Sequence, residues 1–236
     1  KPGCQRLGAA IPGIPNIHSH AFQRGMAGLT EHRVAAKDSF WTWRKAMYHF
    51  ASRISPEDLY HIASQLYLEM LQAGYTSVAE FRYLHHRETG DHYLDIAEMS
   101  YALLNAADRV GIGITLLPVL YMSADFSSQP LKKEQRRFQN TTDTYLKLFN
   151  SLYKQCGGRH QQYIGAALHS LRAVPPHAIT TVLNELDSIA PLSPIHIHIA
   201  EQIREVDDCV RWSGMRPVEW LLHNHQPNNR WCLVHA

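Results

Sequence analysis

Six short apolar runs recur along the chain, separated by longer segments with the patterning of helices. The runs span residues 14–20, 75–84, 113–120, 163–171, 193–201 and 230–236. Each has the length and composition of a buried strand. Strands that alternate with helices are typical of consecutive βα units built around a parallel sheet.

The segments between these runs carry start and stop signals for helices. In 55–74, Ser55 is a good N-cap, Pro56 suits the first helical position and Gly74 suits the end. A helix over 95–111 ends on Gly111 in the same way, and one over 175–190 begins with proline. Residues 131–156 are also predicted to be helical, although no residue marks their ends clearly.

Six βα units fit a (β/α)₈ TIM barrel of which the last two units are absent, because eight strands are needed to close the sheet. The sequence therefore predicts an α/β fold in which residues 1–236 form one partial barrel domain of about six units. An open, doubly wound sheet is the alternative. The chain begins without methionine and ends inside the sixth apolar run, so we expect a fragment.

The composition argues against a nucleic-acid-binding protein and against a membrane protein. Hydrophobic residues make up 45% of the chain and the net charge is +2, with the basic residues scattered, which argues against nucleic-acid binding. No signal peptide and no apolar stretch of about 18 residues occurs, so we expect no membrane segment. Four cysteines far apart in sequence, with no CxxC pair, suggest a reducing compartment. We expect a soluble, cytoplasmic protein.

Histidines gather at the ends of the predicted strands. His18 and His20 end the first strand, and residues two apart in a strand point to the same side. His169, His198 and His235 lie at the ends of the fourth, fifth and sixth strands. In a barrel, these side chains meet at the carboxyl-end mouth, where the active sites of such barrels lie.

Imidazole is the commonest metal ligand, and three ligands with an open position suit catalytic zinc, which lowers the pKa of a bound water to about 7. Iron, manganese and nickel accept the same ligand types. Glu201, three residues after His198, is a candidate for proton transfer from that water to a leaving nitrogen. His196 lies one layer deeper, and we interpret it as a hydrogen-bonded core histidine.

The histidine pattern resembles the amidohydrolase superfamily of metal-dependent (β/α)₈ hydrolases. Longer strings are similar to the formimidoylglutamate deiminase family, namely PNIHSHAFQRGMAGL, SFWTWRKAMYHF, AEFRYLHH, LPVLY, HSLRAVPP, HIHIAEQ with EVDDC, RPVEWLL and RWCLVHA. The resemblance implies hydrolysis of N-formimino-L-glutamate to N-formyl-L-glutamate and ammonia, a step of histidine degradation.

The resemblance also implies roles for individual residues. It assigns His18, His20 and His198 as ligands of one Zn²⁺, Glu201 as the acid/base and His235 as a catalytic histidine. A further ligand in this family is an aspartate at the end of the eighth strand, which no residue of this sequence provides. The family also implies a small flanking β domain and a homodimer for the full-length protein.

The implied substrate is a small molecule with two carboxylates, for which bidentate cationic donors are suited. Arg172 and Arg44 are the candidates. The resemblance adds Gln23, Tyr83 and His169 to the substrate pocket. Arg44 belongs to a long segment between the first strand and the first predicted helix, which we expect to form a loop over the mouth. The tryptophans Trp41 and Trp43 would anchor this loop to the core.

Two other functions fit the same pattern. Related amidohydrolases deaminate purine-like heterocycles, and a pocket for such a substrate needs aromatic walls and amide donors instead of paired arginines. Alternatively, the chain is a non-catalytic fragment that at most binds a metal.

Overall fold

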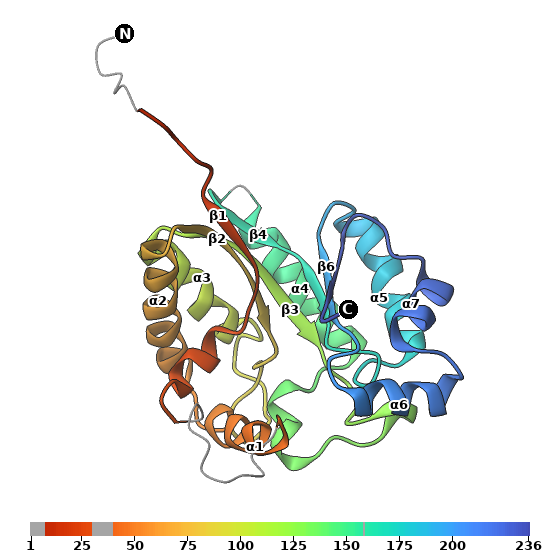
Figure 1. Ribbon diagram of the computed structural model, residues 1–236. Coiled ribbons are helices and arrows are strands. Elements are labelled where there is room, and N and C mark those ends of the chain that lie inside the picture. Colours follow the sequence, from red (N-terminus) through yellow and green to blue (C-terminus); the bar gives the residue numbers. More distant parts are fainter. Residues whose placement is uncertain (1–7, 30–39, 158) are drawn as a thin grey trace.

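A parallel β-sheet forms the centre of the protein in a computed structural model that describes residues 8–29, 40–157 and 159–236 (Figure 1). Its seven strands in these ranges are β1 (Ile14–Ser19), β2 (Tyr75–Arg82), β3 (Gly113–Leu120), β4 (Gln162–Ile164), β5 (Ala166–Leu168), β6 (Ile195–His198) and β7 (Trp231–Val234). The strand order is β1-β2-β3-β5-β6-β7, and β4 also pairs with β3.

The strand order identifies the fold class. Along this order each strand pairs in parallel with its neighbour, and β4 also pairs in parallel with β3, so the order never reverses. A doubly wound sheet requires such a reversal, whereas a (β/α)₈ barrel does not. The prediction of a partial barrel is therefore confirmed. Strands β1 and β7 lie at the two edges of the sheet.

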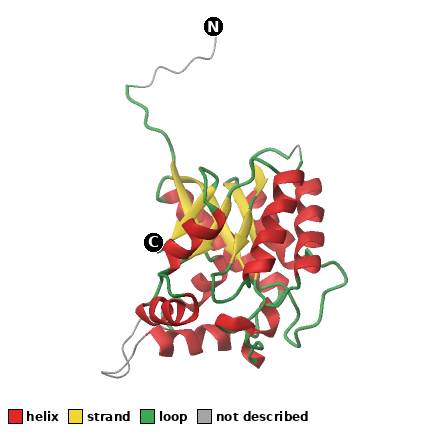
Figure 2. Cartoon of the chain, turned by 90° about the vertical axis from the view of Figure 1, so that its right-hand side faces the viewer, coloured by secondary structure: helices red, strands yellow, loops and turns green. Residues whose placement is uncertain are grey.

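Helices surround the sheet (Figures 1 and 2). The α-helices are α1 (Phe40–Ala51), α2 (Pro56–Gln72), α3 (Glu98–Val110), α4 (Thr142–Cys156), α5 (Pro176–Ile189), α6 (Ile203–Ser213) and α7 (Pro217–His225). Three 3₁₀ helices are η1 (Ala21–Met26), η2 (Phe126–Ser128) and η3 (Lys133–Phe138). None of these helices is long and apolar enough to cross a membrane.

The predicted helix signals hold, with one exception. Ser55 caps α2 by accepting from the backbone N–H of Asp58, and Gly111 ends α3 in the left-handed conformation at φ 85°. The region 131–156 is helical as predicted but is not one continuous helix, because it divides into η3 and α4. The break lies where Asn140 donates its backbone N–H to the carbonyl of Tyr121 and Thr141 caps α4.

The prediction of a loop around Arg44 is also wrong, because residues 40–51 form helix α1. Trp43 in this helix is half-buried and packs against the core, as expected of an anchor, whereas the side chain of Trp41 lies outside what the structure describes. The sequence of this segment did not indicate a helix, because its aromatic residues are also common in strands and in loops that pack against a core.

The predicted fourth strand is divided into β4 and β5 by the insertion of a side chain. The hydroxyl of Tyr145, fully buried on α4, donates to the carbonyl of Pro118 at 3.2 Å and accepts from the backbone N–H of Ala167 at 3.3 Å. It therefore bridges two backbone groups that would otherwise pair directly, and Pro118 itself has no N–H to offer. Both halves keep the same register against β3.

Gly165 sits at this division because no larger residue fits there. A Cβ atom at this position would lie 2.6 Å from a methyl group of Leu117 and 2.8 Å from the carbonyl oxygen of Pro194. The close approach of these backbones lets β5 continue toward the carboxyl end of the sheet, where β6 places His198.

We predict that Tyr145→Phe lowers the free energy of unfolding by about 1–3 kcal/mol, because it leaves buried backbone groups without a partner. Urea unfolding measures this. The matched control is Tyr153→Phe on the same helix, whose ring is 38% exposed and which should change stability by less than about 0.5 kcal/mol. Equal effects of the two substitutions would show that the bridge contributes nothing.

Candidate metal centre and active site

The pair His18 and His20 converges at the carboxyl end of β1, as the spacing predicts. Their Nε2 atoms lie 3.1 Å apart. The Nδ1 atom of His20 lies 2.9 Å from the backbone carbonyl oxygen of Phe81, which can only accept. This places the proton of His20 on Nδ1 and leaves a lone pair on Nε2, the state in which imidazole binds a metal.

His198, at the end of β6, brings a third ring nitrogen to the same point. Its Nε2 atom lies 3.0 Å from that of His18, and ligand atoms of all three histidines lie within 4.8 Å of one another. Two nitrogens bound to one zinc ion at about 2.1 Å lie roughly 3.4 Å apart at the tetrahedral angle. The three imidazoles therefore fit a single divalent cation.

Burial keeps these imidazoles neutral. It lowers the pKa of His18 to about 3, helped by the neighbouring His20, and lowers that of His20 to about 4. Burial also moves the pKa of His198 well below its ordinary value, and the nearby His20 adds to this. Because a metal binds the unprotonated ring, the site is ready for a cation at neutral pH.

Glu201 and His235 lie beside the three histidines. The His235 ring stacks on that of His198 with the centroids 5.3 Å apart, and its Nε2 atom lies 4.0 Å from Oε1 of Glu201. Glu201 directly follows Ala200, whose backbone is left-handed at φ 59°. The backbone of His235 is itself left-handed at φ 73°. Such strained positions cost about 1–3 kcal/mol and are common at functional sites.

Tyr83, Gln23 and His169 line one side of this centre. The amide of Gln23 donates to the Tyr83 hydroxyl at 3.4 Å, and the Tyr83 ring lies 5.4 Å from His20 and 5.7 Å from His169. The His169 ring in turn lies 5.4 Å from that of His198. The structure thus brings together three of the five residues predicted for the substrate pocket.

The two predicted arginines are held in one hydrogen-bonded network. Nη1 of Arg172 donates to the Ala124 carbonyl at 2.9 Å and to the Tyr121 hydroxyl at 3.4 Å, and Nε of Arg44 donates to the Tyr48 hydroxyl at 2.8 Å. The amide of Gln135 connects the two tyrosines, at 2.7 Å from Tyr121 and 3.5 Å from Tyr48.

Both guanidinium groups act on His169. Burial lowers the pKa of His169 well below its ordinary value, and the positive charges of Arg172 and Arg44 lower it further. Both guanidinium groups are thus close enough for their charges to reach His169. Arg172 also contacts the hydroxyl of Tyr121, whose ring lies 4.4 Å from that of His169.

Three members of this arrangement were missed by sequence reasoning, namely Tyr48, Tyr121 and Glu205. Glu205 accepts from the backbone N–H of Glu201, its Oε1 atom is buried without a partner among the described residues, and burial raises its pKa to about 7. Its signals in the sequence were its place at the start of the string EVDDC and its spacing of four residues from Glu201. The two tyrosines lie in the strings SFWTWRKAMYHF and LPVLY, but their roles had no local signal, because the network that joins them exists only in the folded chain.

His196 is a buried core residue, as predicted, but the predicted hydrogen bond of its Nδ1 atom is absent from the described residues. Its Nδ1 atom has no hydrogen-bond partner in the described ranges, and burial lowers its pKa to about 4. It lies one layer below His198 and close enough to His18 to lower the pKa of that residue. It is not among the three residues that converge on one point.

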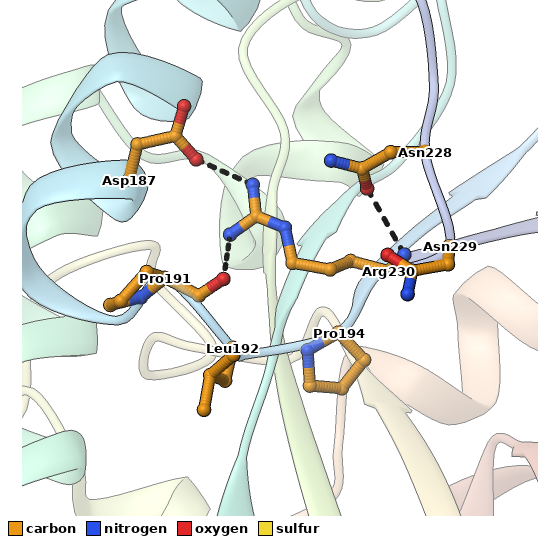
Figure 3. A pocket seen from close by; sticks show the side chains of 7 residues that line it. All are labelled: Asp187, Pro191, Leu192, Pro194, Asn228, Asn229 and Arg230. Carbon is orange, nitrogen blue, oxygen red and sulfur yellow. Dashed lines mark hydrogen bonds and ion pairs between the residues drawn. The ribbon is translucent and has the colours of Figure 1, made fainter.

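A separate surface cavity of about 420 Å³ lies far from this centre (Figure 3). Pro194 and Arg230, which line it, directly precede β6 and β7, so the cavity opens at the amino ends of these strands. The Arg230 guanidinium donates to Asp187 at 2.5 Å and to the carbonyl of Pro191 at 2.9 Å. Its charge is therefore already engaged by the protein, and the candidate site is at the opposite end of the sheet.

A partial parallel barrel with histidines at its carboxyl end is the architecture of metal-dependent barrel hydrolases, and sequence comparison agrees. The sequence model of the amidohydrolase family matches residues 9–236. The chain belongs to the amidohydrolase family.

Individual relatives narrow the comparison. The chain is 53% identical to formimidoylglutamate deiminase of Pseudomonas aeruginosa over 99% of its own length and 51% of the relative. It is 24% identical to a 5-methylthioadenosine/S-adenosylhomocysteine deaminase of Halalkalibacterium halodurans, over 96% of this chain and 45% of the relative. The chain thus spans about half the length of the curated relatives it matches.

A crystal structure of an amidohydrolase from Brucella melitensis superposes with a TM-score of 0.88 at 46% identity, over 95% of this chain and 49% of the other. An adenosine deaminase from Xanthomonas campestris superposes with a TM-score of 0.72 at 20% identity, over 95% of this chain and 44% of the other. The second likeness concerns the fold alone.

We predict that the free energy of unfolding of the metal-free protein rises with pH between about 4.5 and 6.5. In this window the unfolded chain binds more protons than the folded one, because the pKa is lowered in the folded state for His18, His20, His85, His86, His169, His196, His198 and His225. Glu80 and Glu205, whose pKa is raised to about 7, act in the opposite direction but are fewer.

Urea unfolding in the presence of a chelator measures this dependence, and we expect more than about 1 kcal/mol per pH unit. The variant His169→Asn removes one of the contributing groups and should have a shallower slope. A stability that is flat or that falls between pH 4.5 and 6.5 would contradict the prediction.

Proposed function

We propose that the protein carrying this chain is a metal-dependent enzyme that hydrolyses N-formimino-L-glutamate to N-formyl-L-glutamate and ammonia, as a step of histidine degradation. The observation that carries the proposal is the position of Arg172 and Arg44. The charges of both arginines lower the pKa of His169, which lies beside the three histidines that could hold a metal. The identity of 53% to a formimidoylglutamate deiminase supports it.

The three histidines would hold one zinc ion, and the family implies an aspartate outside this sequence as a further ligand. When bound, a divalent metal supplies an activated water nucleophile at neutral pH and polarises the bond that is attacked. Zinc is favoured by the donor set of neutral imidazoles. The solved adenosine deaminase of similar fold was crystallised with zinc, which supports the choice of metal.

In the proposal, Glu201 moves the protons. Water adds to the formimino carbon, and the carboxylate of Glu201 passes the two protons of this water, one after the other, to the formimino nitrogen. The bond between carbon and this nitrogen then breaks, ammonia leaves, and the oxygen of the water becomes the formyl carbonyl. In the proposal, His235 stabilises the charge that develops, and the distance of 4.0 Å between its Nε2 atom and Oε1 of Glu201 supports this role. Glu205 accepts from the backbone N–H of Glu201 and so restrains the position of the acid/base.

The two arginines would bind the carboxylates of the substrate. Guanidinium groups pair with carboxylates through two parallel hydrogen bonds, and such charged bonds are stronger than neutral ones. The hydroxyls of Tyr121 and Tyr48 accept from these guanidinium groups and so hold each in a defined orientation. We further propose a cytoplasmic homodimer for the full-length protein, following the family resemblance.

We predict that the full-length protein carrying this sequence releases ammonia from N-formimino-L-glutamate with about one zinc ion per chain. Arg172→Ala should lower kcat/KM by roughly 30-fold or more, because truncating one partner of a charged pair costs at least about 2 kcal/mol. Ammonia release and metal content are measured on the same sample.

Arg172→Lys is a graded control, which keeps the charge but loses the bidentate geometry and should fall between wild type and Arg172→Ala. Arg211→Ala changes an exposed arginine of α6 and should leave kcat/KM unchanged. Zinc without turnover on this substrate, but with turnover on purine nucleosides, would favour the heterocycle deaminases, to which this chain is more distantly related.

We predict that Glu201→Gln lowers kcat by at least about 100-fold while the zinc content stays at the wild-type level. General acid/base groups contribute roughly 10²–10⁴-fold to rate, and glutamine cannot accept or release a proton. Glutamine keeps the size of the side chain, so the metal-binding histidines should not move. A variant with full zinc occupancy and a rate near that of wild type would exclude the proposed role.

A further inference from the structure

Glu80 is a buried carboxylate behind the metal centre. It lies on β2 next to Phe81, whose ring faces His18 and His198 with centroids 5.3 Å and 4.2 Å away. Because side chains alternate along a strand, Glu80 points away from the histidines and toward helix α2. It is only 2% exposed, so its charge is almost completely removed from water.

The hydrogen bonds of Glu80 connect the metal-binding segment to helix α2. Its Oε1 atom accepts from the backbone N–H of Ala21 at 2.6 Å, and the carboxylate also accepts from the Ser19 side chain. Its Oε2 atom accepts from the Tyr67 hydroxyl of α2 at 3.2 Å. Glu80 therefore holds the residues on both sides of His20.

The regular ladder between β1 and β2 is interrupted where the first histidine lies. Asn16 pairs with Val78 and Ser19 pairs with Glu80, so β1 spans three residue steps where β2 spans two. Such a bulge turns side chains to new directions but removes ladder hydrogen bonds, and bulges are common beside active sites. The contacts of Glu80 restrain the chain directly after this irregularity.

Burial of a carboxylate is unfavourable unless hydrogen bonds compensate for the lost water. Burial raises the pKa of Glu80 to about 7, and the hydrogen bonds from Ala21, Ser19 and Tyr67 act in the opposite direction. Two of these three donors belong to the segment that carries His18 and His20. The charge of the buried Arg82 also favours the ionised carboxyl group of Glu80.

We propose that Glu80 is a positioning residue that sets His18 and His20 for the metal by holding the Ser19 hydroxyl and the Ala21 N–H. The inference depends on the metal centre of the proposed function. Residues that orient ligands without touching the metal are known to change metal affinity about 10–100-fold when they are replaced.

The test is the zinc affinity of the full-length protein, measured by competition with a chromophoric chelator. Glu80→Ala should bind zinc about 10–100-fold more weakly than wild type. Glu80→Gln keeps an oxygen that can accept from Ala21 and should recover most of the affinity. Urea unfolding of each variant reports the loss of stability separately.

Two matched variants each remove one hydroxyl group that donates to the carboxylate of Glu80. Ser19→Ala removes the donor on the metal-binding segment, and Tyr67→Phe removes the donor on α2. We expect Ser19→Ala to weaken zinc binding severalfold and Tyr67→Phe to leave it unchanged, although both lower stability. This pair provides the test if Glu80→Ala does not fold.

The outcomes separate the inference from the proposed function. If Ser19→Ala and Tyr67→Phe bind zinc equally tightly, or if folded Glu80→Ala keeps the wild-type affinity, Glu80 has a structural role only and the inference is overturned. If wild-type protein binds no zinc, the metal centre itself is overturned, and the inference with it.

Discussion

The meeting of His18 with His198 is the constraint on which the site depends. Their Nε2 atoms lie 3.0 Å apart although 180 positions separate them in the chain, and β2, β3 and β5 stand between β1 and β6 in the sheet. Neighbouring strands lie about 4.8 Å apart, so a flat sheet would hold these two strands far from each other. Only the curvature of a barrel brings the histidines together.

Polar groups in the layer between the sheet and the helices tie the strands to the helices that pack on them. Tyr145 bridges backbone groups of β3 and β5, and Glu80 ties the end of β1 to α2. Both side chains are almost completely buried, so their hydrogen bonds are made in surroundings where an unpaired polar group is costly. The geometry on the inside of the barrel therefore rests on interactions made on its outside.

Within the mouth, acidic and basic side chains lie close to one another. Burial raises the pKa of Glu205, the charges of Arg172 and Arg44 lower it, and the charge of Glu201 raises it. The same two arginines lower the pKa of His169. The proposed preference for a dicarboxylate over a heterocycle rests on these two arginines.

The sequence by itself determined the alternation of strands and helices and the histidines at the strand ends, because strand periodicity and the HxH spacing are local properties. It left the doubly wound sheet open, and the strand order decided for the barrel. It also indicated Glu201, which follows β6 directly. It did not determine helix α1, the division of the fourth strand at Gly165, or the roles of Tyr121, Tyr48, Glu205 and Glu80. These were decided by tertiary structure, because each depends on contacts between residues far apart in the chain or on burial, neither of which a local pattern records.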